Sequence, residues 1–212
     1  MMNINDIATK LDQVRVLPIL VADNVQRAIR CVEILAENGL NCVEITLRTP
    51  NALKVLAAVV KACPSVCVGA GTLLTTQQIN AVQDAGATFG ISPGITPTLA
   101  RAAADSGLPY FPGVASASDV MLALEHGFNV VKLFPSDIVG SINMAKALGG
   151  PFPDVRFCLT GGVSQETMPE LLQQSNVLCV GGSWMCASRL IEAENWTLIA
   201  QLALAASTLG KR

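Results

Sequence analysis

One lysine is unusual in this chain because it lies in an apolar segment with the character of a β-strand. Lys132 interrupts the run Val130–Pro135, and it is the only one of the six lysines in a strand-like segment. Removing an ammonium group from water is costly unless the charge is paired, so a buried lysine tends to lose its proton and can then attack a carbonyl carbon. Lys132 is therefore a candidate nucleophile. The alternative is a lysine that reaches water from a strand end or is neutralised by a buried acid.

A single acid also lies within a strand-like run. Residues 42–48 alternate in polarity, and side chains alternate between the two faces of a strand, so Glu44, Thr46 and Arg48 share one face. We expect this polar face to point away from covering helices and Glu44 to lie near Lys132. The alternative is an ion pair without a catalytic role, although buried pairs seldom add stability.

Glycine-rich segments follow several strand-like runs. Residues 69–72 end in Thr72, whose hydroxyl could bind a carboxylate, and Pro93 lies within the segment 92–94. Either segment could be a simple turn. Two pairs of glycines, Gly161-Gly162 and Gly181-Gly182, follow the last two runs, where parallel barrels often bind phosphate through exposed amides.

These residues are carried by short apolar runs that alternate with amphipathic helical stretches. The strand-like runs span residues 14–21, 42–47, 66–71, 88–92, 110–114, 130–134, 156–160 and 177–180. Helical patterns span residues 24–38, 50–63, 76–85, 97–106 and 118–126, and most end beside a glycine, as at Gly39, Gly86, Gly107 and Gly127.

The alternation predicts an α/β fold in which a parallel sheet is covered by helices. Eight strand–helix units most economically close into a (β/α)₈ TIM barrel, formed here by residues 1–212 as a single domain with a short N-terminal helix over residues 3–11. An open doubly wound sheet is the alternative, but no GxGxxG motif opens the first helix. In such barrels the reactive groups lie at the C-terminal ends of the strands.

Composition limits the classes of partner and cofactor. The chain has 212 residues, 51% of them hydrophobic, and a net charge of -2, so we expect no nucleic-acid partner. It shows neither a leader peptide nor a transmembrane run, which predicts a cytoplasmic protein that does not enter a membrane. With seven cysteines and His126 as the only histidine, we expect no disulfide, metal site or cofactor. We expect His126 to cap a helix instead.

Six motifs together resemble a known family over essentially the whole chain. They are Glu44-Ile45-Thr46-Leu47-Arg48, Gly69-Ala70-Gly71-Thr72, Ile91-Ser92-Pro93-Gly94, Val131-Lys132-Leu133-Phe134-Pro135, Leu159-Thr160-Gly161-Gly162 and Gly181-Gly182-Ser183-Trp184. In order and spacing they resemble the 2-dehydro-3-deoxy-phosphogluconate aldolases, also called KHG/KDPG aldolases. Each motif is weak alone, whereas six in register are strong.

The resemblance implies a class I pyruvate aldolase of the Entner-Doudoroff pathway, a homotrimer of (β/α)₈ barrels that acts on a small phosphorylated 2-oxo acid. It implies that Lys132 is the Schiff-base lysine and Glu44 the acid/base. The implied substrate-binding residues are Arg48 and Thr72 for the pyruvate carboxylate, Pro93 and Phe134 as walls, Thr160 for the sugar-acid hydroxyls, and Gly161, Gly162, Gly182 and Ser183 for the phosphate.

One position bears on substrate choice, since relatives that act on the galactonate epimer carry valine where this chain has Thr160. The threonine favours the gluconate form. The chain departs from the family pattern at Leu133, which should point outward, and at Asp137. Three alternatives stay open: preference for the galactonate epimer or for 4-hydroxy-2-oxoglutarate, a phosphate-binding barrel isomerase, and a metabolite-binding barrel without catalysis.

Overall fold

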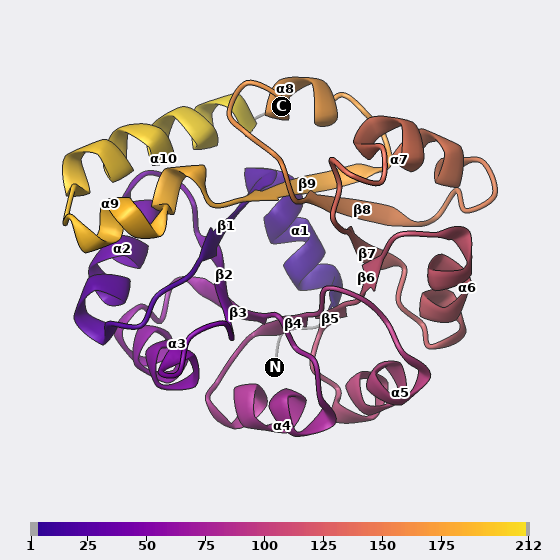
Figure 1. Ribbon diagram of the computed structural model, residues 1–212, viewed down its shortest axis with the longest axis horizontal. Coiled ribbons are helices and arrows are strands. Elements are labelled where there is room, and N and C mark those ends of the chain that lie inside the picture. The colour runs from indigo at the N-terminus through magenta and orange to yellow at the C-terminus, as the bar shows by residue number, and fades with distance from the viewer. Residues whose placement is uncertain (1–3, 211–212) are drawn as a thin grey trace.

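The computed structural model describes residues 4–210 and consists of parallel strands arranged in a ring, with helices around the outside (Figure 1). The strands are β1 (Val16–Leu20), β2 (Cys42–Thr46), β3 (Cys67–Gly71), β4 (Phe89–Ile91), β5 (Tyr110–Phe111), β6 (Gly113–Val114), β7 (Val130–Leu133), β8 (Arg156–Thr160) and β9 (Val177–Gly182). The predicted alternation of strands and helices is therefore confirmed.

Helices follow most of the strands, and they are more numerous than the helices that the sequence pattern indicated. They are α1 (Ile4–Val14), α2 (Val25–Glu37), α3 (Ala52–Ala62), α4 (Thr76–Asp84), α5 (Pro97–Ser106), α6 (Ala117–Glu125), α7 (Ser141–Gly149), α8 (Met168–Leu171), the 3₁₀ helix η1 (Trp184–Cys186), α9 (Ser188–Glu192) and α10 (Trp196–Gly210). The predicted N-terminal helix is α1; residue 3 of that prediction lies outside the described residues.

The fifth strand-like run forms two short strands, so the described chain has nine strands where the sequence predicted eight. The sheet order is β5-β4-β3-β2-β1-β9-β8-β7-β6, and β5 and β6 are joined through Pro112. Pro112 has no N–H to donate, but its carbonyl accepts from the Lys132 amide at 2.9 Å, while the Phe111 carbonyl accepts from Ser92 at 3.4 Å. The run thus changes partner from β4 to β7, and this exchange closes the barrel.

Alternate side chains of the strands pack in two separate layers. Val43, Ile45 and Leu133 belong to the core between the sheet and the outer helices, whereas Cys42 and Cys158 belong to a second cluster inside the barrel. The period-two prediction for β2 and the outward direction of Leu133 are both confirmed. Polar side chains on the opposite face, such as Glu44, therefore point inward.

Helix α1 closes the N-terminal end of the barrel. In the view down the barrel it crosses the space enclosed by the strands (Figure 1), and its Ile7 and Leu11 are buried in the interior cluster with Leu17 and Phe89. Ile7 and Leu11 recur with helical spacing, and this apolar face supplies the bottom of the interior core. The C-terminal end of the barrel is thereby left to carry the reactive groups.

The ends of the outer helices follow the capping signals in the sequence. Thr75 and Gln78 form a capping box at the start of α4. At the end of α5, Gly107 takes the left-handed conformation with φ of 70°, which a glycine adopts without a side-chain clash. His126 is the C-cap of α6, with Nδ1 3.1 Å from the Leu122 carbonyl, as predicted.

Two further observations concern the described residues as a whole. All seven cysteines are buried free thiols. Between residues 4 and 210, no helix has the length and apolar character needed to cross a bilayer.

Candidate active site

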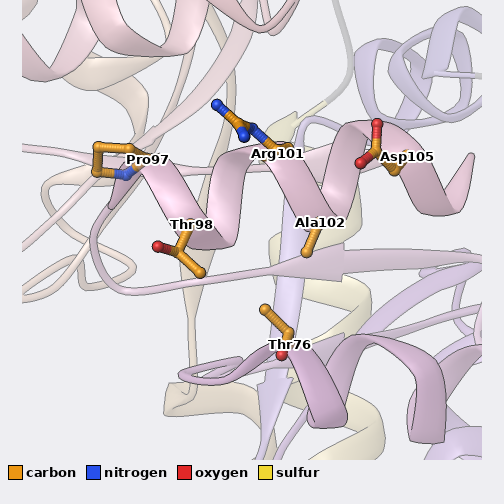
Figure 2. Close-up of a pocket in the computed structure, with 6 residues that line it drawn as sticks. All are labelled: Thr76, Pro97, Thr98, Arg101, Ala102 and Asp105. Atoms are coloured by element: carbon orange, nitrogen blue, oxygen red, sulfur yellow. The ribbon is translucent and has the colours of Figure 1, made fainter.

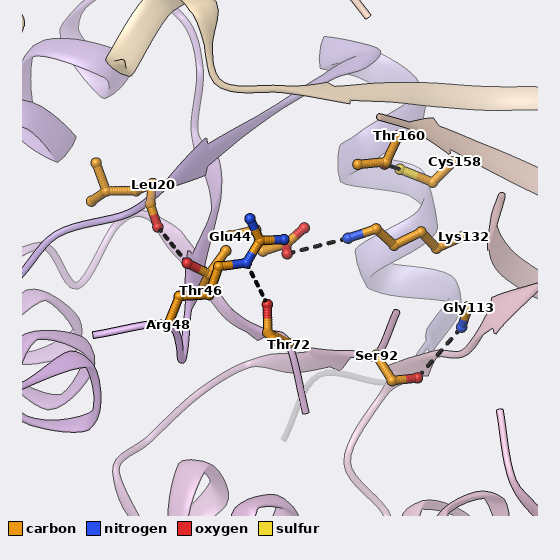
Figure 3. A network of polar contacts seen from close by, with 10 residues as sticks. All are labelled: Leu20, Glu44, Thr46, Arg48, Thr72, Ser92, Gly113, Lys132, Cys158 and Thr160. Atoms are coloured by element: carbon orange, nitrogen blue, oxygen red, sulfur yellow. Dashed lines mark hydrogen bonds and ion pairs between the residues drawn. The ribbon is translucent and has the colours of Figure 1, made fainter. Parts of the chain in front are cut away.

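The predicted functional residues gather at the C-terminal end of the barrel. Figure 3 shows Glu44 and Lys132 pointing toward each other across the interior. Thr160 lies above the lysine in this view, and Arg48 and Thr72 lie on the side of Glu44. Glu44 comes from β2 and Lys132 from β7, so the meeting of the two depends on closure of the ring.

Lys132 and Glu44 form a buried ion pair. Lys132 Nζ lies 3.4 Å from Glu44 Oε1, and the two side chains are only 3% and 1% exposed. Glu44 Oε2 is buried and has no hydrogen-bond partner among the described residues. A buried polar atom without a partner is costly, and this one lies beside the amine, where it is free to accept a proton or a substrate hydroxyl.

An aromatic ring and a proline loop adjoin the lysine. Lys132 Nζ lies 5.2 Å from the centre of the Phe134 ring. Gly113 is the strand partner of Lys132. It packs closely on the loop after β4, and a Cβ placed on Gly113 would lie 2.2 Å from the Pro93 carbonyl carbon. Buried Ser92 holds that loop, because its Oγ donates to the Gly94 carbonyl at 2.6 Å and accepts from the Gly113 amide at 3.4 Å. Phe134 is thus a neighbour of the amine, and Pro93 lies against the strand partner of Lys132.

Arg48 and Thr72 meet at the rim above the ion pair. Arg48 Nε donates to Thr72 Oγ1 at 3.1 Å (Figure 3). Thr72 has φ of 62°, an unfavourable conformation for a β-branched residue that surrounding contacts must hold in place. The exposed guanidinium and the hydroxyl together form a donor pair suited to a carboxylate. Thr46, on the same strand face, instead donates to the Leu20 carbonyl at 3.4 Å.

Thr160 and Cys158 lie one above the other on β8. Their Oγ1 and Sγ atoms are 3.6 Å apart, and Cys158 is the strand partner of both Lys132 and Cys179. A hydrogen bond from Cys179 lowers the pKa of the Cys158 thiol, with smaller contributions from Thr160 and Lys132, although burial acts in the opposite direction. Cys158 thus forms part of the polar floor beneath Thr160.

A cavity of about 150 Å³ opens between the last two strand ends and the rim. It contains Thr160, Phe134 and Arg48 together with both glycine pairs; its full lining is Ile19, Arg48, Phe134, Thr160, Gly161, Gly162, Val163, Gly181, Gly182 and Ser183. Gly161 and Gly162 have φ of 99° and 68°, so the turn after β8 takes conformations that other residues rarely adopt. The sequence-predicted phosphate residues therefore come together in one cavity, whose lining does not include the deeper Lys132 and Glu44.

A larger surface hollow lies elsewhere. A hollow of about 340 Å³ between α4 and α5 is lined by Thr76, Pro97, Thr98, Arg101, Ala102 and Asp105 (Figure 2). These residues lie on outer helices and include no buried charge. Within residues 4–210, no three His, Cys, Asp or Glu side chains are grouped so as to hold a metal ion.

Several residues of the site were missed by the sequence reasoning. Ile19 could have been found, since strand periodicity places it two residues after Leu17 on the inner face of β1. Cys158 is different, because its importance depends on register: only when β7 and β8 are aligned does it become the strand partner of Lys132. The single sequence does not contain that information.

Comparison with known proteins identifies relatives over the whole site. A family model described as KDPG and KHG aldolase matches residues 7–202. The 2-dehydro-3-deoxy-phosphogluconate aldolase of Pseudomonas aeruginosa is 41% identical over 92% of this chain and 89% of its own length.

Solved structures of two such aldolases superpose closely on the barrel. The KDPG aldolase of Legionella pneumophila, with pyruvate captured as a covalent carbinolamine, has a TM-score of 0.91 and 41% identity, and the match covers 94% of this chain and 97% of that one. The 2-keto-3-deoxy-6-phosphogluconate aldolase of Zymomonas mobilis with 3-phosphoglycerate has a TM-score of 0.92, 36% identity and 98% coverage of both chains.

Proposed function

Because this chain belongs to the KDPG and KHG aldolase family, we propose that Lys132 is the amine that forms the Schiff base of a class I pyruvate aldolase. The protein is a carbon–carbon lyase that cleaves 2-dehydro-3-deoxy-6-phosphogluconate to pyruvate and glyceraldehyde 3-phosphate. The observation that carries the assignment of the lysine is the buried ion pair with Glu44, 3.4 Å away at the C-terminal end of the barrel.

The reaction begins with attack of the Lys132 amine on the C2 carbonyl of the substrate. The carbinolamine loses water to give an iminium, which accepts electrons more readily than a ketone does. Glu44 transfers protons in this step, directly or through a water molecule. It then accepts the proton of the C4 hydroxyl as the C3–C4 bond breaks, and the bonding electrons move to the iminium nitrogen.

Cleavage releases glyceraldehyde 3-phosphate and leaves the enamine of pyruvate on Lys132. A proton returned to C3 regenerates the iminium, and water then hydrolyses it to pyruvate and the free amine. Glu44 Oε2 suits the proton transfers, since it is buried and has no competing protein partner among the described residues. Phe134 and Pro93 limit the access of bulk water to these intermediates.

The two ends of the substrate bind to different parts of the rim. Arg48 and Thr72 hold the carboxylate of the pyruvate half, and the glycines of the cavity, Gly161, Gly162 and Gly182, together with Ser183, hold the phosphate. Thr160 lies between the two ends and contacts the sugar-acid hydroxyls. Binding at the remote phosphate orients the C3–C4 bond over the amine.

Three finer assignments belong to the same proposal. The preferred epimer is the gluconate form, since Thr160 presents a hydroxyl to the cavity. 4-Hydroxy-2-oxoglutarate is a second substrate, cleaved to pyruvate and glyoxylate, because it shares the 2-oxo acid that reacts with Lys132. An isomerase of the same fold is not favoured, because proton transfer alone would not need a buried amine beside Glu44.

The protein acts as a homotrimer in the cytoplasm. The resemblance of the six motifs to a trimeric family supports the association, and large apolar side chains such as Ile138 at 79% exposure and Leu74 at 60% lie on the surface. Seven unpaired thiols suit a reducing compartment. Light scattering of the purified protein should give the mass of three chains.

The central assignment is tested by trapping the imine. The protein is treated with pyruvate and borohydride, and the intact mass and the modified peptide are determined. We expect one pyruvate-derived group per chain, located at Lys132. An adduct on another lysine would contradict the assignment, and the same treatment without pyruvate is the control.

A further inference from the structure

Gly71 is the last residue of β3, and it lies directly against the side chain of Glu44 on β2. The two strands are paired in parallel, with Thr46 opposite Gly71 and Glu44 opposite Gly69. A Cβ placed on Gly71 would come 1.9 Å from Glu44 Oε1, 2.5 Å from Cδ and 2.6 Å from Cγ. The carboxylate therefore occupies the space that any side chain at position 71 would fill.

The backbone of Gly71 does not itself require a glycine. The φ angle of Gly71 is not in the positive range that favours glycine. Gly71 lies within strand β3, and any residue can adopt the extended conformation of a strand. The three atoms nearest to the added Cβ all belong to Glu44. The requirement for glycine at this position is therefore steric, and it comes from one side chain.

That side chain is the one paired with Lys132. Glu44 Oε1, the atom nearest to the missing Cβ, is also the atom that lies 3.4 Å from Lys132 Nζ. We propose that Gly71 is a positioning residue for the aldol cleavage: the absence of a side chain at position 71 provides the space in which the Glu44 carboxylate is held against Lys132. This inference rests on the role of Glu44 in the proposed function.

The substitution Gly71→Ala tests the inference, because its methyl group forces the carboxylate to turn away. Lys132 keeps its own place, so pyruvate should still be trapped on it by borohydride, but more slowly, because Glu44 also transfers protons as the iminium forms. Proton transfer should suffer, with kcat lower by about 10² to 10⁴-fold, the usual contribution of an acid/base group, and with KM little changed. Exchange of the pyruvate methyl protons with deuterated water should slow in parallel.

A shorter acid tests whether the methyl group acts through the carboxylate. In Glu44→Asp the carboxylate is already drawn back from Lys132 by one methylene, so adding Gly71→Ala, which acts by displacing that same group, should cause little further loss of kcat. A double variant as active as Glu44→Asp alone supports steric coupling between the two positions. Additive losses would overturn the inference, because the methyl group would then act through another neighbour.

Gly69→Ala is the matched control on the same strand face. Its methyl would lie 2.1 Å from the Phe89 ring, and the three atoms nearest to it all belong to that ring rather than to Glu44. We expect this variant to lower the Tm, and its effects should be additive with those of Glu44→Asp. Coupling of equal size at both glycines would mean that crowding of the barrel interior, rather than contact with Glu44, explains the result.

Two further variants keep the outcomes distinct. If Glu44→Gln turns over substrate normally, the proposed role of Glu44 is wrong. If Glu44→Gln is inactive but Gly71→Ala turns over normally, only the inference about Gly71 is overturned. If Gly71→Ala does not fold, Gly71→Ala combined with Glu44→Ala decides the matter. Recovery of a folded protein in that pair supports the steric contact, and failure of the pair to fold where Glu44→Ala alone does fold overturns it.

Discussion

Lys132 and Glu44, separated by 88 residues along the chain, meet inside the barrel with Nζ and Oε1 3.4 Å apart. Each charge compensates the other, and water reaches almost none of either side chain. The pair therefore links stability to function, since removing one partner leaves the other charge buried.

Replacing the lysine should abolish the chemistry and also weaken the fold. Lys132→Met keeps most of the volume but leaves the Glu44 carboxylate unpaired, which typically costs about 3 to 5 kcal/mol. We expect no borohydride adduct, no turnover and a lower free energy of unfolding in urea. Lys132→Met combined with Glu44→Gln should recover most of the stability and none of the activity. A single variant as stable as the wild type would show that the carboxylate is not charged there.

Replacing the acid should separate binding from turnover. Glu44→Gln preserves shape and hydrogen-bonding capacity but cannot accept a proton, so we expect kcat to fall by about 10² to 10⁴-fold while substrate still binds. Steady-state and single-turnover kinetics measure the two quantities. Near-normal kcat would leave Glu44 as a structural partner of Lys132.

Ser183 should matter for one end of the substrate only. Loss of a hydrogen bond to a charged group is worth about 1.5 to 3 kcal/mol, so Ser183→Ala should lower kcat/KM for the phosphorylated substrate by about 10 to 100-fold, less if neighbouring amides compensate. Cleavage of 4-hydroxy-2-oxoglutarate, which carries no phosphate, should change little. Equal losses on both substrates would remove Ser183 from the phosphate site.

Activity should survive treatment with EDTA. The iminium on Lys132 already receives the electrons of the breaking bond, so the proposed mechanism assigns no step to a Lewis acid. The measurement is the rate of pyruvate release before and after dialysis against the chelator. A loss restored by a divalent cation would contradict the lysine mechanism.

The barrel was predictable because each strand carries its own signal. Alternation along residues 42–48 placed Glu44 inside, and the same rule placed Leu133 outside. The division of the fifth strand was missed, although Pro112 within residues 110–114 is a signal, since a proline cannot donate to a sheet. The helices after residue 140 were also not predicted, and the shortest α-helix among them, α8, spans only four residues.

The site was predictable where the type of a single residue indicates its function. It was not predictable where a contact depends on the register between two strands. Lys132 and Glu44 are unusual within their own segments, which sequence alone reveals. Gly71 resembles any turn glycine until β2 and β3 are aligned, and only then does its contact with Glu44 emerge. The roles of the remaining binding residues stay predictions that the experiments above address.

Closure of one end of the barrel by α1 has a consequence for the order of events in turnover. Ile7 and Leu11 fill the bottom of the interior, so Lys132 is approached from the C-terminal mouth alone. The pyruvate half is covalently held at the deeper position, and the phosphorylated aldehyde lies between it and solvent. We therefore expect ordered kinetics: the aldehyde leaves first and pyruvate last, and in the condensation direction pyruvate must bind before the aldehyde.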